Sequence, residues 1–154
     1  MENVQRNKNT VIVLSHQGLG STVTVCNIIK AMDLKPLIVS TPIEVYEATI
    51  LEAWNNYDFD YEIVDTFQLV LDDILALKVN LIDVVCCISI WEGQRALMAK
   101  VNQEVGANDI SSQQVSAIQD KYIFRNELNN AGLSECGAYS LSDLKSKDIN
   151  QLFE

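Results

Sequence analysis

The residues best suited to chemistry follow an apolar run near the start of the chain. His16 and Gln17 carry hydrogen-bonding side chains, and Gly18 and Gly20 come directly after them. Glycines between a strand and a helix let the backbone approach a ligand, and the N–H groups that open the helix attract anions. The segment therefore suits a phosphate or carboxylate site, or else a tight turn without a ligand. His16 itself suits either a hydrogen bond to a substrate or a local bond within the turn.

This glycine segment departs from the fingerprint of dinucleotide-binding proteins. Val23 stands where that fingerprint has its third glycine. The acid that would bind the ribose is expected at the end of the next strand, where the chain has Ser40 and Thr41. A nicotinamide cofactor is therefore disfavoured.

Two charged residues further along the chain each have two interpretations. Glu92 ends the apolar run that begins at Val84, where it can meet an amine or a metal-bound phosphate. With Ser89 it also fits a capping box at a helix start. Lys121 follows Asp120, a helix-capping residue, so its positive charge lies in the first helical turn, where it is repelled by the helix dipole. An anion such as a nucleotide phosphate would relieve that repulsion. The other interpretation of Lys121 is a solvated lysine.

Apolar runs and helical stripes alternate along the chain, which predicts an α/β fold: a Rossmann-like open parallel sheet with helices on both faces, followed by a short, mainly helical segment. The strands are expected at Thr10–Ser15, Leu37–Ser40, Tyr61–Asp65 and Leu81–Ile90. The helical stripes between and after them are Val25, Ile28, Ile29 and Met32; Ile43, Tyr46, Ile50 and Trp54, in a helix opened by Thr41 and Pro42; Phe67, Val70, Leu71, Ile74 and Leu77, capped by Thr66; and Leu97, Met98, Val101 and Val105, stopped by Gly106.

The pattern divides the chain into three parts. Residues 1–9 are expected to be a flexible tail, residues 10–106 the sheet domain, and residues 107–154 a linker with the start of another domain. Within that last part the expected elements are a helix at Ser111–Ile118, a helix at Asp120–Ala131 with Phe124, Leu128 and Ala131 inward, a strand at Ala138–Leu141 and a final helix at Ser142–Phe153.

Composition excludes several classes of protein. The net charge of −10 disfavours nucleic-acid binding, which depends on Lys and Arg neutralising phosphates. No apolar run is long enough to span a membrane, and the start lacks a signal peptide, so a cytoplasmic protein with reduced cysteines is expected. No CxxC occurs, and His16 is the only histidine, so a zinc site is poorly supported.

The order of these features resembles the amino-terminal third of the ATP-grasp superfamily of carboxylate–amine ligases. The resemblance rests on Ser89-Ile90-Trp91-Glu92, on Asp120–Leu128, and on Ala131-Gly132-Leu133. It implies a pre-ATP-grasp, substrate-side domain over residues 10–106 and the start of the ATP-binding domain after it. In such ligases ATP phosphorylates a carboxylate, and an amine then attacks the acyl phosphate.

The resemblance also implies roles for particular residues. Lys121 would contact ATP, Glu92 would touch substrate, and His16 with Gln17, Gly18 and Gly20 would lie near the substrate cleft. ATP and Mg belong to the complete enzyme, whose metal ligands come later in the family's order, so this chain is expected to be inactive in isolation. The implied partners are a small carboxylate or amine substrate, the remainder of the enzyme, and a second copy in a homodimer.

A stand-alone Rossmann-like module for ligand binding or regulation is the alternative hypothesis. A receiver domain is disfavoured because it needs acids at the end of the first strand, where Ser15 and His16 stand.

Overall fold

In the computed structural model, the residues described are 8–16, 21–43, 47–77, 79–135, 140 and 142. The chain divides into two compact units, Met1–Ser112 and Gln113–Glu154. The predicted strand at Ala138–Leu141 and helix at Ser142–Phe153 lie outside the described residues, apart from Ser140 and Ser142.

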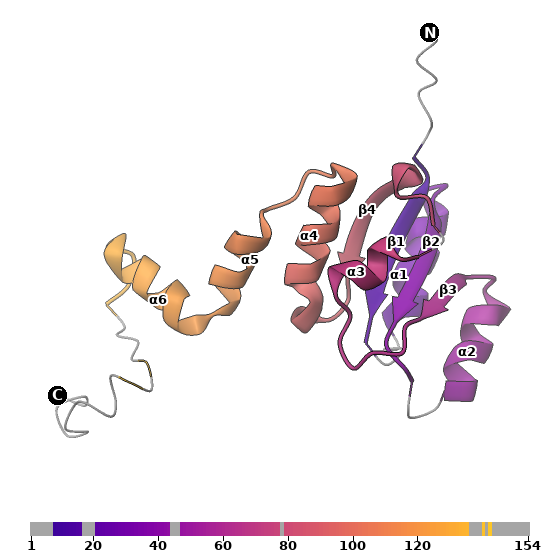
Figure 1. The fold of residues 1–154 in the computed structure, drawn as a ribbon, viewed down its shortest axis with the longest axis horizontal. Coiled ribbons are helices and arrows are strands. Elements are labelled where there is room, and N and C mark those ends of the chain that lie inside the picture. The colour runs from indigo at the N-terminus through magenta and orange to yellow at the C-terminus, as the bar shows by residue number, and fades with distance from the viewer. Residues whose placement is uncertain are drawn as a thin grey trace, which may run out of the picture. The chain divides into compact units, whose positions relative to one another are not determined.

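The first unit is built on a parallel sheet of four strands (Figure 1). The strands are β1 (Thr10–Ser15), β2 (Lys35–Ser40), β3 (Asp60–Ile63) and β4 (Val84–Ser89). Their order is β3-β2-β1-β4, so the chain moves outward from β1 to β3 and then returns to the other side of β1. The predicted Rossmann-like fold class is confirmed.

Helices cover both faces of this sheet because alternate strand residues point to opposite sides. On one face, Cys26 and Ile29 of α1 (Ser21–Ala31) and Trp54 of α2 (Glu47–Asn56) pack against β1 and β2. On the other face, Ile74 of α3 (Leu71–Leu75) and Val101 of α4 (Arg95–Val105) pack against the same two strands. Two short 3-10 helices, η1 (Leu81–Asp83) and η2 (Glu92–Gln94), flank β4.

Three predicted helices in this unit differ from the structure. The buried face of α1 is Thr22, Cys26 and Ile29, whereas Ile28 and Met32 are exposed, so the predicted stripe was wrong for those two residues. The second helix does not begin at Thr41, because residues 41–43 have no helical structure.

The third predicted helix is shortened to α3, and the predicted cap at Thr66 was wrong. Residues 64–70 are irregular, with Phe67 86% exposed and Leu69 buried in its place. Val70 is the N-cap, and its N–H donates to Asp73 Oδ2 at 2.8 Å.

Helix α4 ends as predicted at Gly106, whose φ of 70° places it in the left-handed region. Within the same helix, the buried side chain of Asn102 binds the edge of the sheet. Its Oδ1 accepts from Cys87 N at 2.6 Å, while its Nδ2 donates to Cys87 O at 2.9 Å and to Asp109 Oδ2 at 2.7 Å. These bonds fix α4 against the outer side of β4.

The second unit contains α6 (Lys121–Asn130), and α5 (Ser112–Gln119) begins at the division between the units. Helix α6 has no buried residue: Phe124 and Ala131 are exposed and Leu128 is half-buried. The predicted inward face was therefore wrong for Phe124 and Ala131.

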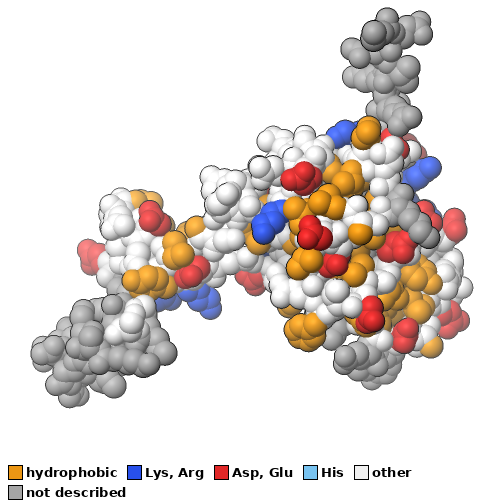
Figure 2. Space-filling model, in the orientation of Figure 1, with side chains coloured by type: hydrophobic (Ala, Val, Ile, Leu, Met, Phe, Trp, Pro, Cys, Tyr) orange, Lys and Arg blue, Asp and Glu red, His pale blue; other side chains and the backbone are white. Residues whose placement is uncertain are grey.

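The described cysteines Cys26, Cys86 and Cys87 are free thiols. Cys86 and Cys87 contribute to the clusters on opposite faces of the sheet, as alternation along a strand predicts. No helix among the described residues has the length and apolar character needed to span a membrane. On the face of the first unit drawn in Figure 2, acidic side chains lie among apolar ones.

Candidate functional site

The carboxyl ends of the four strands bring together the polar residues that the sequence places after them. Parallel pairing sets Ser15 of β1 beside Ser40 of β2, so His16 and Thr41 follow at the same edge of the sheet. Thr41 Oγ1 lies 3.2 Å from His16 Nδ1. His16 therefore lies within hydrogen-bonding distance of the residue that follows the neighbouring strand. The other residues of its own turn, 17–20, lie outside the described ranges.

The ring of His16 is stacked on the indole of Trp91. The ring centroids are 4.2 Å apart and the planes differ by 14°. Phe67 approaches the same imidazole edge-on, at 6.4 Å between centroids. His16 follows β1 and Trp91 follows β4. Between these two strands the direction in which successive strands are added to the sheet reverses. In open α/β sheets this reversal point is where ligands bind.

Local bonds hold Trp91 in this stack. Ser89 Oγ donates to Trp91 O at 2.6 Å, and Trp91 N donates to Ser89 Oγ at 3.2 Å. Gly93 leaves room for the indole, because a Cβ there would lie 2.7 Å from Cη2 of Trp91. Trp91 is thus a platform for the ring of His16.

Glu92 opens η2 directly beyond this stack and is exposed. The N-cap of η2 is Trp91, and Ser89 caps neither η2 nor α4. The predicted capping box was therefore wrong, while contact between Glu92 and a substrate stays a prediction.

Two buried polar side chains near this edge have no hydrogen-bond partner among the residues that the structure describes. Gln94, at the N-cap of α4, is 1% exposed, and both its Oε1 and its Nε2 are unpartnered. Thr66, which follows β3, likewise buries an unpartnered Oγ1. A buried amide or hydroxyl without a partner destabilises a protein by about 1–3 kcal/mol. A hydrogen bond from a ligand to either side chain would offset that penalty.

The structure does not place the remaining predicted site residues relative to this edge. Gln17, Gly18 and Gly20 lie outside the described residues. Lys121 belongs to the second unit, where it is the first residue of α6. Asp120 caps that helix by accepting from Tyr122 N at 2.9 Å and Ile123 N at 3.1 Å, so the cation of Lys121 does lie in the first turn.

Gln94 and Thr66 are candidates that the sequence analysis missed. Gln94 has no motif around it, and only the packing of α4 on the sheet shows that its amide is buried. Thr66 was interpreted as a helix cap because the residues after it have a helical apolar pattern. An irregular segment there frees its hydroxyl from capping.

The described residues do not form a metal centre or a reactive thiol. No group of three or more His, Cys, Asp or Glu side chains within the described ranges could hold a metal ion, so we derive no phosphoryl-transfer step from them. Burial raises the pKa of Cys26 to about 11 against the opposing effect of Lys30. Burial, followed by the charge of Asp109, raises the pKa of Cys86.

Comparison with known proteins gives a match in fold but none in sequence. No family model and no curated protein matches the chain. An L-amino acid ligase from Bacillus licheniformis has a similar structure, with a TM-score of 0.57 and 15% identity. The match covers 84% of this chain and 32% of the ligase chain, so this chain spans about a third of that protein's length. At this identity the similarity establishes a common fold.

Proposed function

We propose that the chain is the substrate-side part of an ATP-grasp ligase that joins a carboxylate to an amine through an acyl phosphate. The observation that carries the proposal is the amide of Gln94, which is buried at the start of α4, one turn beyond the His16–Trp91 stack, and has no partner within the described ranges. Its carboxamide can both donate and accept, which suits a ligand bearing a carboxylate or an amine. The similar fold in a ligase for L-amino acids supports an amino acid as that ligand.

The other residues then have distinct tasks. His16 is oriented by its bond to Thr41 and its stack on Trp91, which leaves Nε2 as the nitrogen available for substrate. Glu92, exposed beside the stack, attracts the ammonium group of an amine substrate. Gln17, Gly18 and Gly20, which follow His16 in the sequence, are proposed as further substrate contacts.

Lys121 contacts ATP in this proposal, as a cation paired with a phosphate beside the positive end of the α6 dipole. Mg would be supplied with ATP in the complete enzyme, and no group of three or more His, Cys, Asp or Glu side chains in the described ranges could hold it. We therefore expect the purified chain to form no ADP from ATP in the presence of Mg and L-amino acids. Substrate-dependent ADP formation would contradict this part of the proposal.

Gln94→Leu tests the proposed binding site because stability and binding should change in opposite directions. Replacing an unpartnered buried amide with an apolar group of similar size should stabilise the free chain by about 1–3 kcal/mol. The same change should weaken the binding of L-amino acids, measured from NMR shifts of the Trp91 indole N–H during titration with L-alanine, L-methionine and L-arginine.

Asn102→Leu is the matched control, because it removes a buried amide whose partners are all present. It should destabilise the chain. If Gln94→Leu is also destabilising, or if no amino acid shifts the Trp91 resonance, the proposed site is wrong. Amino-acid binding by the chain, together with no shift of the Lys121 backbone amide on titration with ATP, would favour the alternative of a separate binding module.

A further inference from the structure

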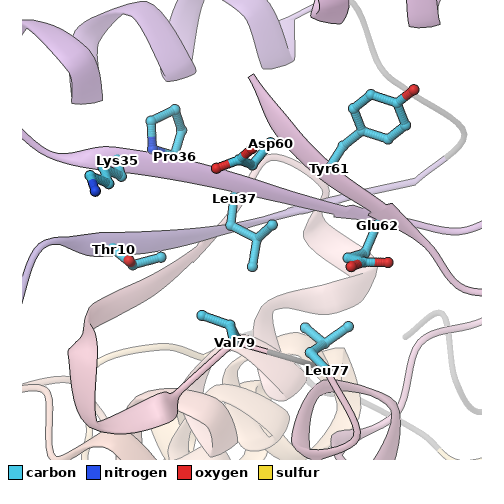
Figure 3. Close-up of a pocket in the computed structure, with 9 residues that line it drawn as sticks. All are labelled: Thr10, Lys35, Pro36, Leu37, Asp60, Tyr61, Glu62, Leu77 and Val79. Atoms are coloured by element: carbon cyan, nitrogen blue, oxygen red, sulfur yellow. The ribbon is translucent and has the colours of Figure 1, made fainter. Parts of the chain in front are cut away.

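A cavity lies at the opposite end of the sheet from the His16–Trp91 stack. It has a volume of about 300 Å³ and is formed by the first residues of β1, β2 and β3 and by the segment that follows α3 (Figure 3). Five residue steps along β2 separate Lys35 in this cavity from Ser40 at the stack's edge, a distance of about 16 Å at 3.3 Å per residue. The cavity is therefore independent of the proposed substrate site.

Charged groups of both signs line this cavity on one face of the sheet. Lys35 lies two residues before Leu37 on β2, and Leu37 pairs with Asp60, which lies two residues before Glu62 on β3. Side chains two residues apart on a strand share a face, so all of these point to the same side. Within the described part of the chain, Lys35, Asp60 and Glu62 form no ion pair with one another.

The floor of the cavity is apolar. Leu37 extends from the sheet toward Leu77 and Val79, and Glu62 extends to the same side of the strands (Figure 3). These three aliphatic side chains are half-buried in the core that α3 and α4 form with the sheet. A ligand that fills the cavity thus meets a cation, two carboxylates and an aliphatic surface.

We propose that this cavity binds a zwitterionic amino acid with an aliphatic side chain. Asp60 and Glu62 bind its ammonium group, and Lys35 binds its carboxylate. Its side chain rests on Leu37, Leu77 and Val79. The volume is at the lower limit of small-molecule sites, which restricts the ligand to about the size of a single amino acid. A simple amine would meet repulsion from Lys35, and a simple carboxylate would meet repulsion from the two acids.

The test is an NMR titration of the whole chain with L-leucine, followed through backbone amide resonances. We expect saturable shifts at Leu37, Tyr61 and Val79. The single-charge analogues 3-methylbutylamine and 4-methylpentanoate should bind at least about threefold more weakly, since the first loses the ion pair with Lys35 and the second loses the ion pairs with Asp60 and Glu62. An increase in ionic strength should weaken leucine binding, because salt screens exposed charges.

Charge-removing variants assign the binding to the cavity. Glu62→Gln and Lys35→Gln should each weaken leucine binding by about threefold, whereas Glu52→Gln, on α2 at the other face of the sheet, should leave it unchanged. The absence of saturable shifts at the cavity up to the solubility limit of leucine would overturn the proposal. So would equal affinity for 3-methylbutylamine. Shifts confined to Trp91 would place leucine at the His16–Trp91 stack. This result would overturn the proposed binding in the cavity and leave the proposed function intact.

Discussion

Replacing Asn102 with alanine should lower the free energy of unfolding of the first unit by about 2–5 kcal/mol. The side chain is 4% exposed and satisfies both the N–H and the C=O of Cys87, which is itself buried. Its removal leaves two buried backbone groups unpaired, at about 1–3 kcal/mol each. The better helix propensity of alanine offsets about 0.6 kcal/mol of this loss.

Urea unfolding followed by tryptophan fluorescence measures this change in the first unit. Trp54 and Trp91 are the two tryptophans of the chain, and both belong to that unit. Asn55→Ala is the matched control, because Asn55 is exposed on α2 and its replacement should change stability by no more than about 0.5 kcal/mol. A loss of less than about 1 kcal/mol for Asn102→Ala would refute the view that Asn102 satisfies the strand edge.

Asn102→Asp tests the same bonds with a side chain of nearly unchanged shape. One carboxylate oxygen can still accept from Cys87 N, but the other would face Cys87 O and the carboxylate of Asp109. The variant should therefore be destabilised at neutral pH. Its stability relative to wild type should recover as the pH falls, because protonation of the new carboxyl restores a donor.

Two further predictions concern the stack and the core. Gly93→Ala should displace Trp91, because the new Cβ would lie 2.7 Å from its ring. The His16 ring protons should then shift downfield in NMR spectra, with a loss of about 1–3 kcal/mol, and unchanged shifts would show that the glycine is not required. For Cys26, burial raises the pKa from 9.0 to about 11, so its stabilising contribution is complete below pH 9 and is lost as the pH rises to 11. Between pH 9 and 11 the free energy of unfolding in urea should therefore fall by on the order of 2 kcal/mol more for wild type than for Cys26→Ala. Equal falls in the two proteins would contradict the raised pKa of Cys26.

The continuous apolar strands were the most predictable part of the fold. Thr10–Ser15 was predicted to the residue because a strand buried on both faces has an uninterrupted apolar run. Helix faces were less predictable. In α1 the buried positions include Thr22 and Cys26, which are smaller and less apolar than the exposed Ile28 and Met32. Close packing against the sheet favoured small side chains over the strongest apolar stripe.

The candidate site was predictable in position but not in composition. His16 and the segment around Trp91 drew attention because each lies at the end of an apolar run, and the structure brings His16 and Trp91 into contact. Gln94 and Thr66 escaped prediction because nothing local marks a buried amide or hydroxyl as unpartnered. That property depends on which neighbours the tertiary fold supplies.

The two outer edges of the sheet differ in what they offer to an incoming strand. On β4, the Asn102 side chain already occupies the backbone groups of Cys87 that strand addition at this point would require. β3 is only four residues long, and short, charged edge strands are poor templates for edge-to-edge aggregation. Growth of the sheet past β4 would first require Asn102 to release the edge, so the position of α4 controls whether this sheet can be extended.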